Sequence, residues 1–233
     1  MIAADRLAEL HFTAQYEASS DLDDVNIAHL DPFLRGLLFT DGTVSRALEA
    51  QRLSPVAVEA VEQVHAPVPA RIARYLDVDE TDDCVRRRVI MTSPGTRLSV
   101  WAESYVVPDR LPDAFVGSLG DSSQGIGGTL RRLKLEDWRE LLWFGLGPAP
   151  PWSRASPAAM TLTRFYRIIT QERPALVISE AFGVEMHLGQ YRLKDSGKEP
   201  VADLSHSPDQ PRFRTRIIDR ERASGKSKAP ASD

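Results

Sequence analysis

One arginine stands where the sequence otherwise predicts an apolar strand face. The stretch Cys84–Pro112 is rich in Val, Ile, Met, Trp and Tyr and is broken by Ser-Pro-Gly, so it predicts two strands joined by a turn. Side chains alternate between the faces of a strand, so Arg87 shares a face with Val85, Val89 and Met91. Because a buried guanidinium is costly without an anion, Arg87 is a candidate for binding a carboxylate of the protein or of a ligand. The alternative is that all the arginines of this strand lie on a solvated face.

A carboxylate in a later predicted strand also stands on an otherwise apolar face. Residues 175–182 predict a strand in which Glu180 shares a face with Leu176 and Ile178. Burial raises the pKa of a carboxyl group and a nearby arginine lowers it, so such a residue is suited to proton transfer. We therefore predict that Arg87 and Glu180 line one pocket, paired directly or bridged by a polar ligand. A purely structural ion pair is the alternative.

Composition limits the classes of protein to consider. The 233 residues are 42% hydrophobic and 27% charged, as in ordinary globular proteins. The net charge of −4 predicts no nucleic-acid partner, and no apolar run is long enough to predict a membrane span. A single cysteine, Cys84, excludes an internal disulfide and favours a reducing, cytoplasmic compartment. The acidic run Asp77–Asp83 has no completing ligands, so we expect no metal and no other cofactor.

The chain predicts one main domain with two appendages. We expect a helix and loop extension over 1–30, the domain over 31–208 and a disordered polar tail over 209–233. Further elements expected within the domain are helices over 32–39, 44–52 and 70–76, a strand over 56–64, a short apolar piece over 113–119, a long helix from 129 to about 144, a linker over 147–159, a strand over 161–169 and a short edge segment within 190–207.

A glycine-rich loop, Asp121–Gly128, precedes the predicted long helix. Such loops bind anions where helical N–H groups point outward. This loop lacks the lysine of a phosphate-binding loop and follows no predicted strand, so a nucleotide site is not expected. A flexible loop is the simpler interpretation.

Four segments together resemble the chorismate pyruvate-lyase family, and most of all its actinobacterial branch, which makes 4-hydroxybenzoate. They are LRGLLFTDGTVSRALEA, the hairpin RRRVI…VWAESYVVPDRLP, GIGGTLRRLKLEDWRELL and TRFYRII…RPALVISEAFG, and they cover roughly residues 31–182. The resemblance implies an α+β fold with an antiparallel sheet of about six strands, helices on one side and a ligand pocket under helical flaps. The order of predicted strands and helices agrees with that fold.

The resemblance also implies roles for individual residues. The carboxylate-binding arginine of the family matches Arg87, and the acidic residue that contacts the hydroxyl end of the product matches Glu180. The backbone amide before the long helix of the family matches Ile126 with Gly127. The implied chemistry needs a small-molecule substrate and no cofactor.

The sequence departs from the family pattern at two basic positions. Gly128 stands where the better-known branch has arginine, and Ser104 stands at a second arginine of the family. Arg164 and Arg167 are candidates to replace the missing charge. Thr43, in the turn before the second predicted helix, completes the expected substrate-binding residues.

Three functions therefore stay open at this stage. The first is cleavage of chorismate to 4-hydroxybenzoate and pyruvate. The second is a related elimination or cyclisation of another substrate in natural-product biosynthesis, which the departures at Gly128 and Ser104 favour. The third is a non-catalytic module that binds a small effector, although no helix-turn-helix is recognisable before Asp31.

Overall fold

The computed structural model describes residues 4–93, 99–120, 125–156 and 158–183. They belong to the first of the two units into which the chain divides, Met1–Pro200. The expected edge segment within 190–207, the end of the domain at 208 and the tail over 209–233 lie outside the described residues.

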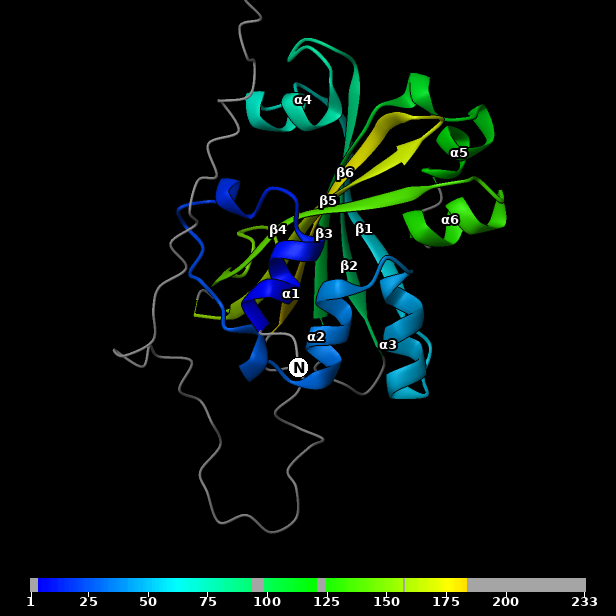
Figure 1. Ribbon diagram of the computed structural model, residues 1–233. Helices are drawn as coiled ribbons and strands as arrows, with labels where there is room; N and C mark the ends of the chain where they lie inside the picture. Colours follow the sequence, from blue (N-terminus) through cyan, green and yellow to red (C-terminus); the bar gives the residue numbers. More distant parts are fainter. Residues whose placement is uncertain (1–3, 94–98, 121–124, 157, 184–233) are drawn as a thin grey trace, which may run out of the picture. The chain divides into compact units, whose positions relative to one another are not determined.

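The centre of this unit is an antiparallel sheet of six strands in the order β1-β2-β3-β6-β5-β4 (Figure 1). The strands are β1 (Ala57–Ala66), β2 (Cys84–Thr92), β3 (Ser99–Val106), β4 (Trp138–Pro148), β5 (Met160–Thr170) and β6 (Arg173–Gly183). The pairing of β3 with β6 joins the two halves of the sheet. Between β5 and β6, Gln171 and Glu172 both have positive φ, as the tight turn of a two-residue hairpin requires.

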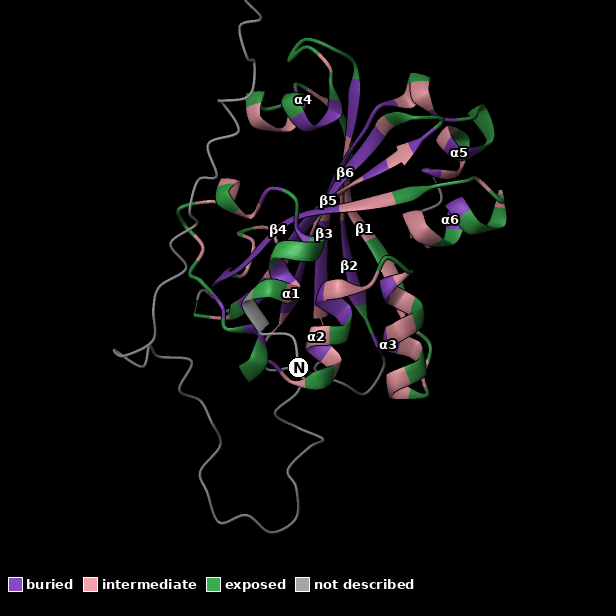
Figure 2. Cartoon of the chain, in the orientation of Figure 1, coloured by how far each residue is buried: buried purple, intermediate pink, exposed green. Residues whose placement is uncertain are grey.

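Most helices lie over one face of the sheet. The α-helices are α1 (Ala4–His11), α2 (Pro32–Phe39), α3 (Val44–Arg52), α4 (Ala70–Leu76), α5 (Asp113–Ser118) and α6 (Ile126–Arg132), and the short 3-10 turns are η1 (Gln15–Glu17), η2 (Ile27–His29) and η3 (Pro108–Arg110). The largest core cluster joins side chains of α1, α2, α3, α5 and α6 to the inner face of the sheet. α4 packs on the other face, and the loop after β4 covers part of that face as well. Figure 2 shows the buried strands and the exposed outer sides of the helices. The fold is therefore the expected α+β class.

Local signals explain why the early helices form where they do. Asp31 accepts hydrogen bonds from the N–H groups of Phe33 and Leu34, and Pro32 occupies the first turn, so α2 begins with a complete cap. The helices predicted over 32–39, 44–52 and 70–76 match α2, α3 and α4 at both ends.

The long helix predicted from 129 to about 144 is wrong. α6 ends at Arg132, Lys134 has a φ of 53°, and β4 begins at Trp138. β4 is buried on both faces over most of its length, and a bulge between Leu141 and Trp143 shifts its register. A strand covered on both faces is a continuous apolar run, and such a run can match helical spacing by chance. The linker is correspondingly shorter, because β4 continues to Pro148.

The described residues of the predicted N-terminal extension, from Ala4 on, pack into the core. Phe12 is buried in the main cluster, and the N–H groups of Thr13 and Ala14 donate to the carbonyls of Leu141 and Leu142 on β4. β4 is the last strand of the sheet, so its backbone would otherwise remain unpaired. The N-terminal segment thus closes the edge of the sheet, a role that apolar spacing in the sequence does not reveal.

Candidate active site

A cavity lies between the inner face of the sheet and the segments that cover it. The space that it encloses is about 560 Å³, counting the open solvent at its mouth. All six strands contribute a side chain to one wall. The other wall is formed by Gly42–Ser45, where α2 leads into α3, and by Gly125–Gly127 at the start of α6. These two covering segments correspond to the helical flaps that the family resemblance implies.

Arg87 lies on the cavity wall, on the face that strand alternation predicts. It is 2% exposed, and its Nε donates to Oε1 of Gln63 on β1 at 3.1 Å. Its neighbours Arg86 and Arg88 point to the opposite face, where both form ion pairs with Glu62. The arginines therefore divide between an enclosed face and a half-buried one, and the alternative that all of them lie on a solvated face is wrong.

Glu180 also lines the cavity, and its carboxylate pairs with Arg164 of β5. Arg87 and Glu180 lie on β2 and β6, with β3 between them. Ser104 of β3 pairs with Arg87, and Ala102 pairs with Glu180. At about 4.8 Å per strand and about 3.4 Å per residue, this register separates the two Cα atoms by about 12 Å. The two charges can therefore contact different ends of one small ligand.

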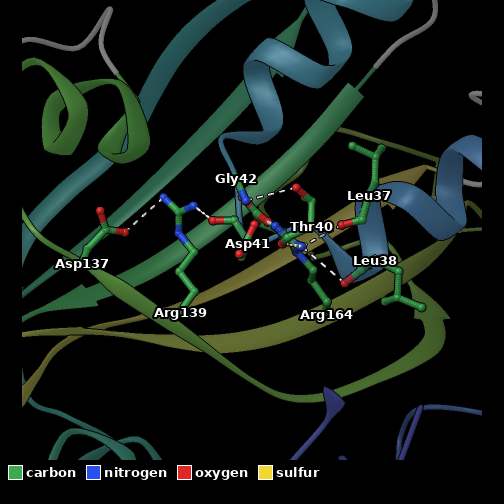
Figure 3. Close-up of polar contacts among 9 residues, drawn as sticks. Leu37, Leu38, Thr40, Asp41, Gly42, Asp137, Arg139 and Arg164 are labelled. Carbon is green, nitrogen blue, oxygen red and sulfur yellow. Dashed lines mark hydrogen bonds and ion pairs between the residues drawn. The ribbon is translucent and has the colours of Figure 1, made fainter. Parts of the chain in front are cut away.

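Arg164 is fully buried behind Glu180 and connects it to the end of α2. Nε and Nη2 lie 2.8 and 2.7 Å from Oε2 of Glu180. Nη1 lies 2.6 Å from the carbonyl oxygen of Leu37 and 2.7 Å from that of Thr40 (Figure 3). A cation here satisfies carbonyl groups that the helix leaves unpaired and interacts favourably with the helix dipole. Arg164 is therefore an internal counter-ion that fixes both Glu180 and the segment covering the cavity.

Tyr166 joins this cluster on the cavity wall. Burial is the main cause that raises the pKa of its phenol, and the carboxylate of Glu180 acts in the same direction. Arg164 and Arg139 act in the opposite direction but do not outweigh burial. Tyr166 is therefore a neutral hydrogen-bonding group in neutral solution.

Four more of the sequence-predicted site residues line the cavity. Ser104 is buried opposite Arg87, and Thr43, Ile126 and Gly127 lie on the covering side. A side chain at Gly127 would approach Thr43 to 3.1 Å, so glycine permits the two covering segments to meet. The turn and the start of α6 therefore close the cavity together.

Three predicted residues lie away from the cavity wall: Arg164, which is buried behind Glu180, and the residues Gly128 and Arg167. Gly128 is exposed and is not part of the lining. Arg167 is on the opposite face of β5, where it pairs with Glu140 at 2.6 Å and donates to the carbonyl of Tyr75. Alternation explains this position, because Arg164 and Arg167 are three residues apart on one strand. Arg167 is thus not placed to replace a missing cavity charge.

The structure adds two ionisable residues that the sequence did not single out, Tyr166 and Arg139. Alternation from Arg164 along β5 was a usable signal for Tyr166. Arg139 had no such signal, because it falls inside the incorrectly predicted helix.

Within the described ranges, no three His, Cys, Asp or Glu side chains gather as a metal site would require. No helix in the described part of the chain is long and apolar enough to span a membrane.

Comparisons with known proteins identify the family of the chain. Residues 38–192 match the model of the family described as chorismate pyruvate-lyase Rv2949c-like. A chorismate pyruvate-lyase of Mycobacterium tuberculosis is 26% identical over 168 residues, which are 69% of this chain and 84% of that protein. One of Mycobacterium leprae is 27% identical over 160 residues, 67% of this chain and 76% of that protein.

Among solved structures, PhnF from Mycobacterium smegmatis shares the fold with a TM-score of 0.51 and 12% identity, over 63% of this chain and 66% of that one. The family match extends over more than half of the chain and contains all six strands. The chain therefore belongs to the Rv2949c-like chorismate pyruvate-lyases, a family of lyase enzymes.

Proposed function

We propose that this protein is a cofactor-independent lyase that converts chorismate to 4-hydroxybenzoate and pyruvate. The observation that carries the proposal is that Arg87 and Glu180, in a chain of this family, line one cavity at separate positions. A rigid cyclic acid with a carboxylate at one end and a hydroxyl group at the other suits this spacing.

The reaction balances without an added oxidant or reductant. The bond between the ring carbon and the ether oxygen breaks, and the adjacent ring carbon, which carries the hydroxyl group, loses its hydrogen. The ring becomes aromatic, and the departing enolpyruvate takes up a proton to become pyruvate. Because aromatisation drives the reaction, the protein needs mainly to orient the substrate and stabilise charge on the leaving group.

Arg87 is the proposed clamp for the ring carboxylate. A guanidinium can bind a carboxylate through two parallel hydrogen bonds, and the contact between Nε and Gln63 fixes its plane. Ser104, next to Arg87 across the strand pair, and the backbone of Ile126 and Gly127 complete that end of the cavity.

Glu180 is the proposed contact for the ring hydroxyl and the group that assists proton transfer. Arg164 holds Oε2, so Oε1 is the proposed contact for the ring hydroxyl. Positioned acid or base groups of this kind typically contribute ~10²–10⁴-fold to rate. Apolar residues of the wall, such as Val89 and Ile178, exclude water and so strengthen these polar contacts.

The test is to incubate purified protein with chorismate and to measure pyruvate by a coupled lactate dehydrogenase assay and 4-hydroxybenzoate by chromatography. We expect equal amounts of the two products, unchanged after dialysis against a chelator. Arg86→Ala is the matched control for Arg87→Ala, because it removes the same charge from the other face of β2. A folded wild-type protein that releases no pyruvate would refute the proposal.

The form of a negative result would distinguish the alternatives. Tight binding of 4-hydroxybenzoate without turnover of chorismate would favour an effector-binding module. Binding of neither compound would favour a different substrate, a possibility for which the uncharged Ser104 on the cavity wall is the specific reason.

A further inference from the structure

Arg139 is a second arginine on the cavity wall, far from Arg87 across the sheet. It lies near the start of β4, paired in register with Ile168, which also lines the cavity. Its side chain is 9% exposed. β2 and β4 are four strand spacings apart, about 19 Å if the sheet were flat. The two guanidinium groups therefore belong to opposite sides of the cavity.

The hydrogen bonds of Arg139 are incomplete. Nη1 donates to the carbonyl of Asp41, and Nη2 lies 3.6 Å from a carboxylate oxygen of Asp137 (Figure 3). Nε is buried and has no hydrogen-bond partner among the residues that the structure describes. A buried donor without an acceptor is costly, and more so when it is charged, so such a group beside a binding cavity indicates a missing acceptor.

The proposed substrate offers two carboxylates, of which the ring carboxylate is assigned above to Arg87. We propose that Arg139 binds the second carboxylate, the one on the enolpyruvyl side chain, through the part of its guanidinium that lies on the cavity wall. This inference rests on the proposed function for the identity of the substrate. Arg139 would then restore from β4 the charge that the family places at Ser104 on β3.

A carboxylate contact by Arg139 would make the site bind substrate more tightly than product, which a purely structural role of Arg139 would not do. The aromatic product keeps the ring carboxylate but has lost the enolpyruvyl one. Arg87 should therefore contribute to the binding of both substrate and product, whereas Arg139 should contribute to the binding of substrate alone. If Arg139 served only to hold the turn at Asp41, its loss would weaken the binding of both ligands equally.

The experiment compares a dianion and a monoanion that the enzyme does not consume. The dianion is 3-(1-carboxyvinyloxy)benzoate, whose ring is already aromatic, and the monoanion is 4-hydroxybenzoate. Binding is measured by titration calorimetry for wild type, Arg139→Met, Arg139→Lys and Arg132→Met. Arg132 is exposed on α6, so its variant controls for the loss of one positive charge near the site.

We expect Arg139→Met to weaken binding of the dianion by roughly 10- to 100-fold, as for the loss of a hydrogen bond to a charged group. Its affinity for the monoanion should stay within about threefold of wild type. Arg139→Lys should recover part of the dianion affinity, and Arg132→Met should change neither ligand. Equal weakening of both ligands by Arg139→Met, or no weakening of the dianion, would overturn the inference. Pyruvate release from chorismate by wild type is recorded separately, so a failure of the proposed function is distinguishable from a failure of the Arg139 site.

Discussion

The ion pair between Arg164 and Glu180 gives the sharpest stability prediction. Arg164→Met keeps an unbranched, apolar stem but removes the guanidinium. Glu180 then loses its counter-ion inside the protein, and the carbonyls of Leu37 and Thr40 lose their donor. Removing one partner of a buried pair typically costs about 3–5 kcal/mol, and an unsatisfied buried carbonyl adds to that cost.

We therefore expect Arg164→Met to lose at least about 3 kcal/mol of unfolding free energy, which lowers the Tm by roughly 6–12 °C in a domain of this size. The measurement is urea unfolding at neutral pH with a matched thermal melt. Arg154→Met is the control, because it removes the same chemical pairing with Glu59 from a site where both side chains are mostly exposed. Solvent screens that pair, so its loss should cost less than about 1 kcal/mol.

A double variant tests the cause. Arg164→Met with Glu180→Gln removes both charges, so it should be more stable than Arg164→Met alone. If Arg164→Met costs no more than the Arg154 control, or if the two substitutions add without coupling, then Arg164 is not the counter-ion of Glu180 and the account of the cluster is wrong.

Three further predictions concern activity and pH. Arg87→Lys should lower kcat/KM by roughly 100-fold or more, since a point charge cannot orient a carboxylate as a planar guanidinium does, while Arg86→Ala stays near wild type in the same steady-state assay. Glu180→Gln should bind 4-hydroxybenzoate within a few-fold of wild type but lose ~10²–10⁴-fold in kcat; unchanged kcat would exclude its role in proton transfer. Burial and the nearby Glu17 raise the pKa of Tyr75 from 10.0 to about 12, so this tyrosine stabilises the fold fully below pH 10 and progressively less as the pH rises toward 12. Urea unfolding at increasing alkaline pH should show that the unfolding free energy of Tyr75→Phe falls less steeply than that of wild type. An identical slope in the two proteins would contradict that assignment.

The sequence was sufficient to predict those features that depend on neighbouring residues alone. The start of α2 follows from Asp31 and Pro32, and the cavity-facing side of β2 follows from the two-residue period around Arg87. The sequence does not predict that Arg164 pairs with Glu180, because this pairing depends on the register between β5 and β6. The sequence did single out Arg164, but as a ligand for substrate, whereas the structure uses it to hold Glu180 and the end of α2.

The incorrect prediction of a helix from 129 to about 144 is also the reason that the sequence did not single out Arg139. In a helix, the apolar residues Leu141 and Leu142 would have lain near one another on a single side, leaving Arg139 with the solvent-facing charges. In β4 the period is two, so Arg139 falls on the same face as Leu141, while Leu142 and Trp143 pack on the other face around the bulge. The period of one short segment thus decides whether the cavity has one arginine on its wall or two. Because the product of the proposed reaction retains only one carboxylate, this second arginine would let the site distinguish the proposed substrate from its product by charge.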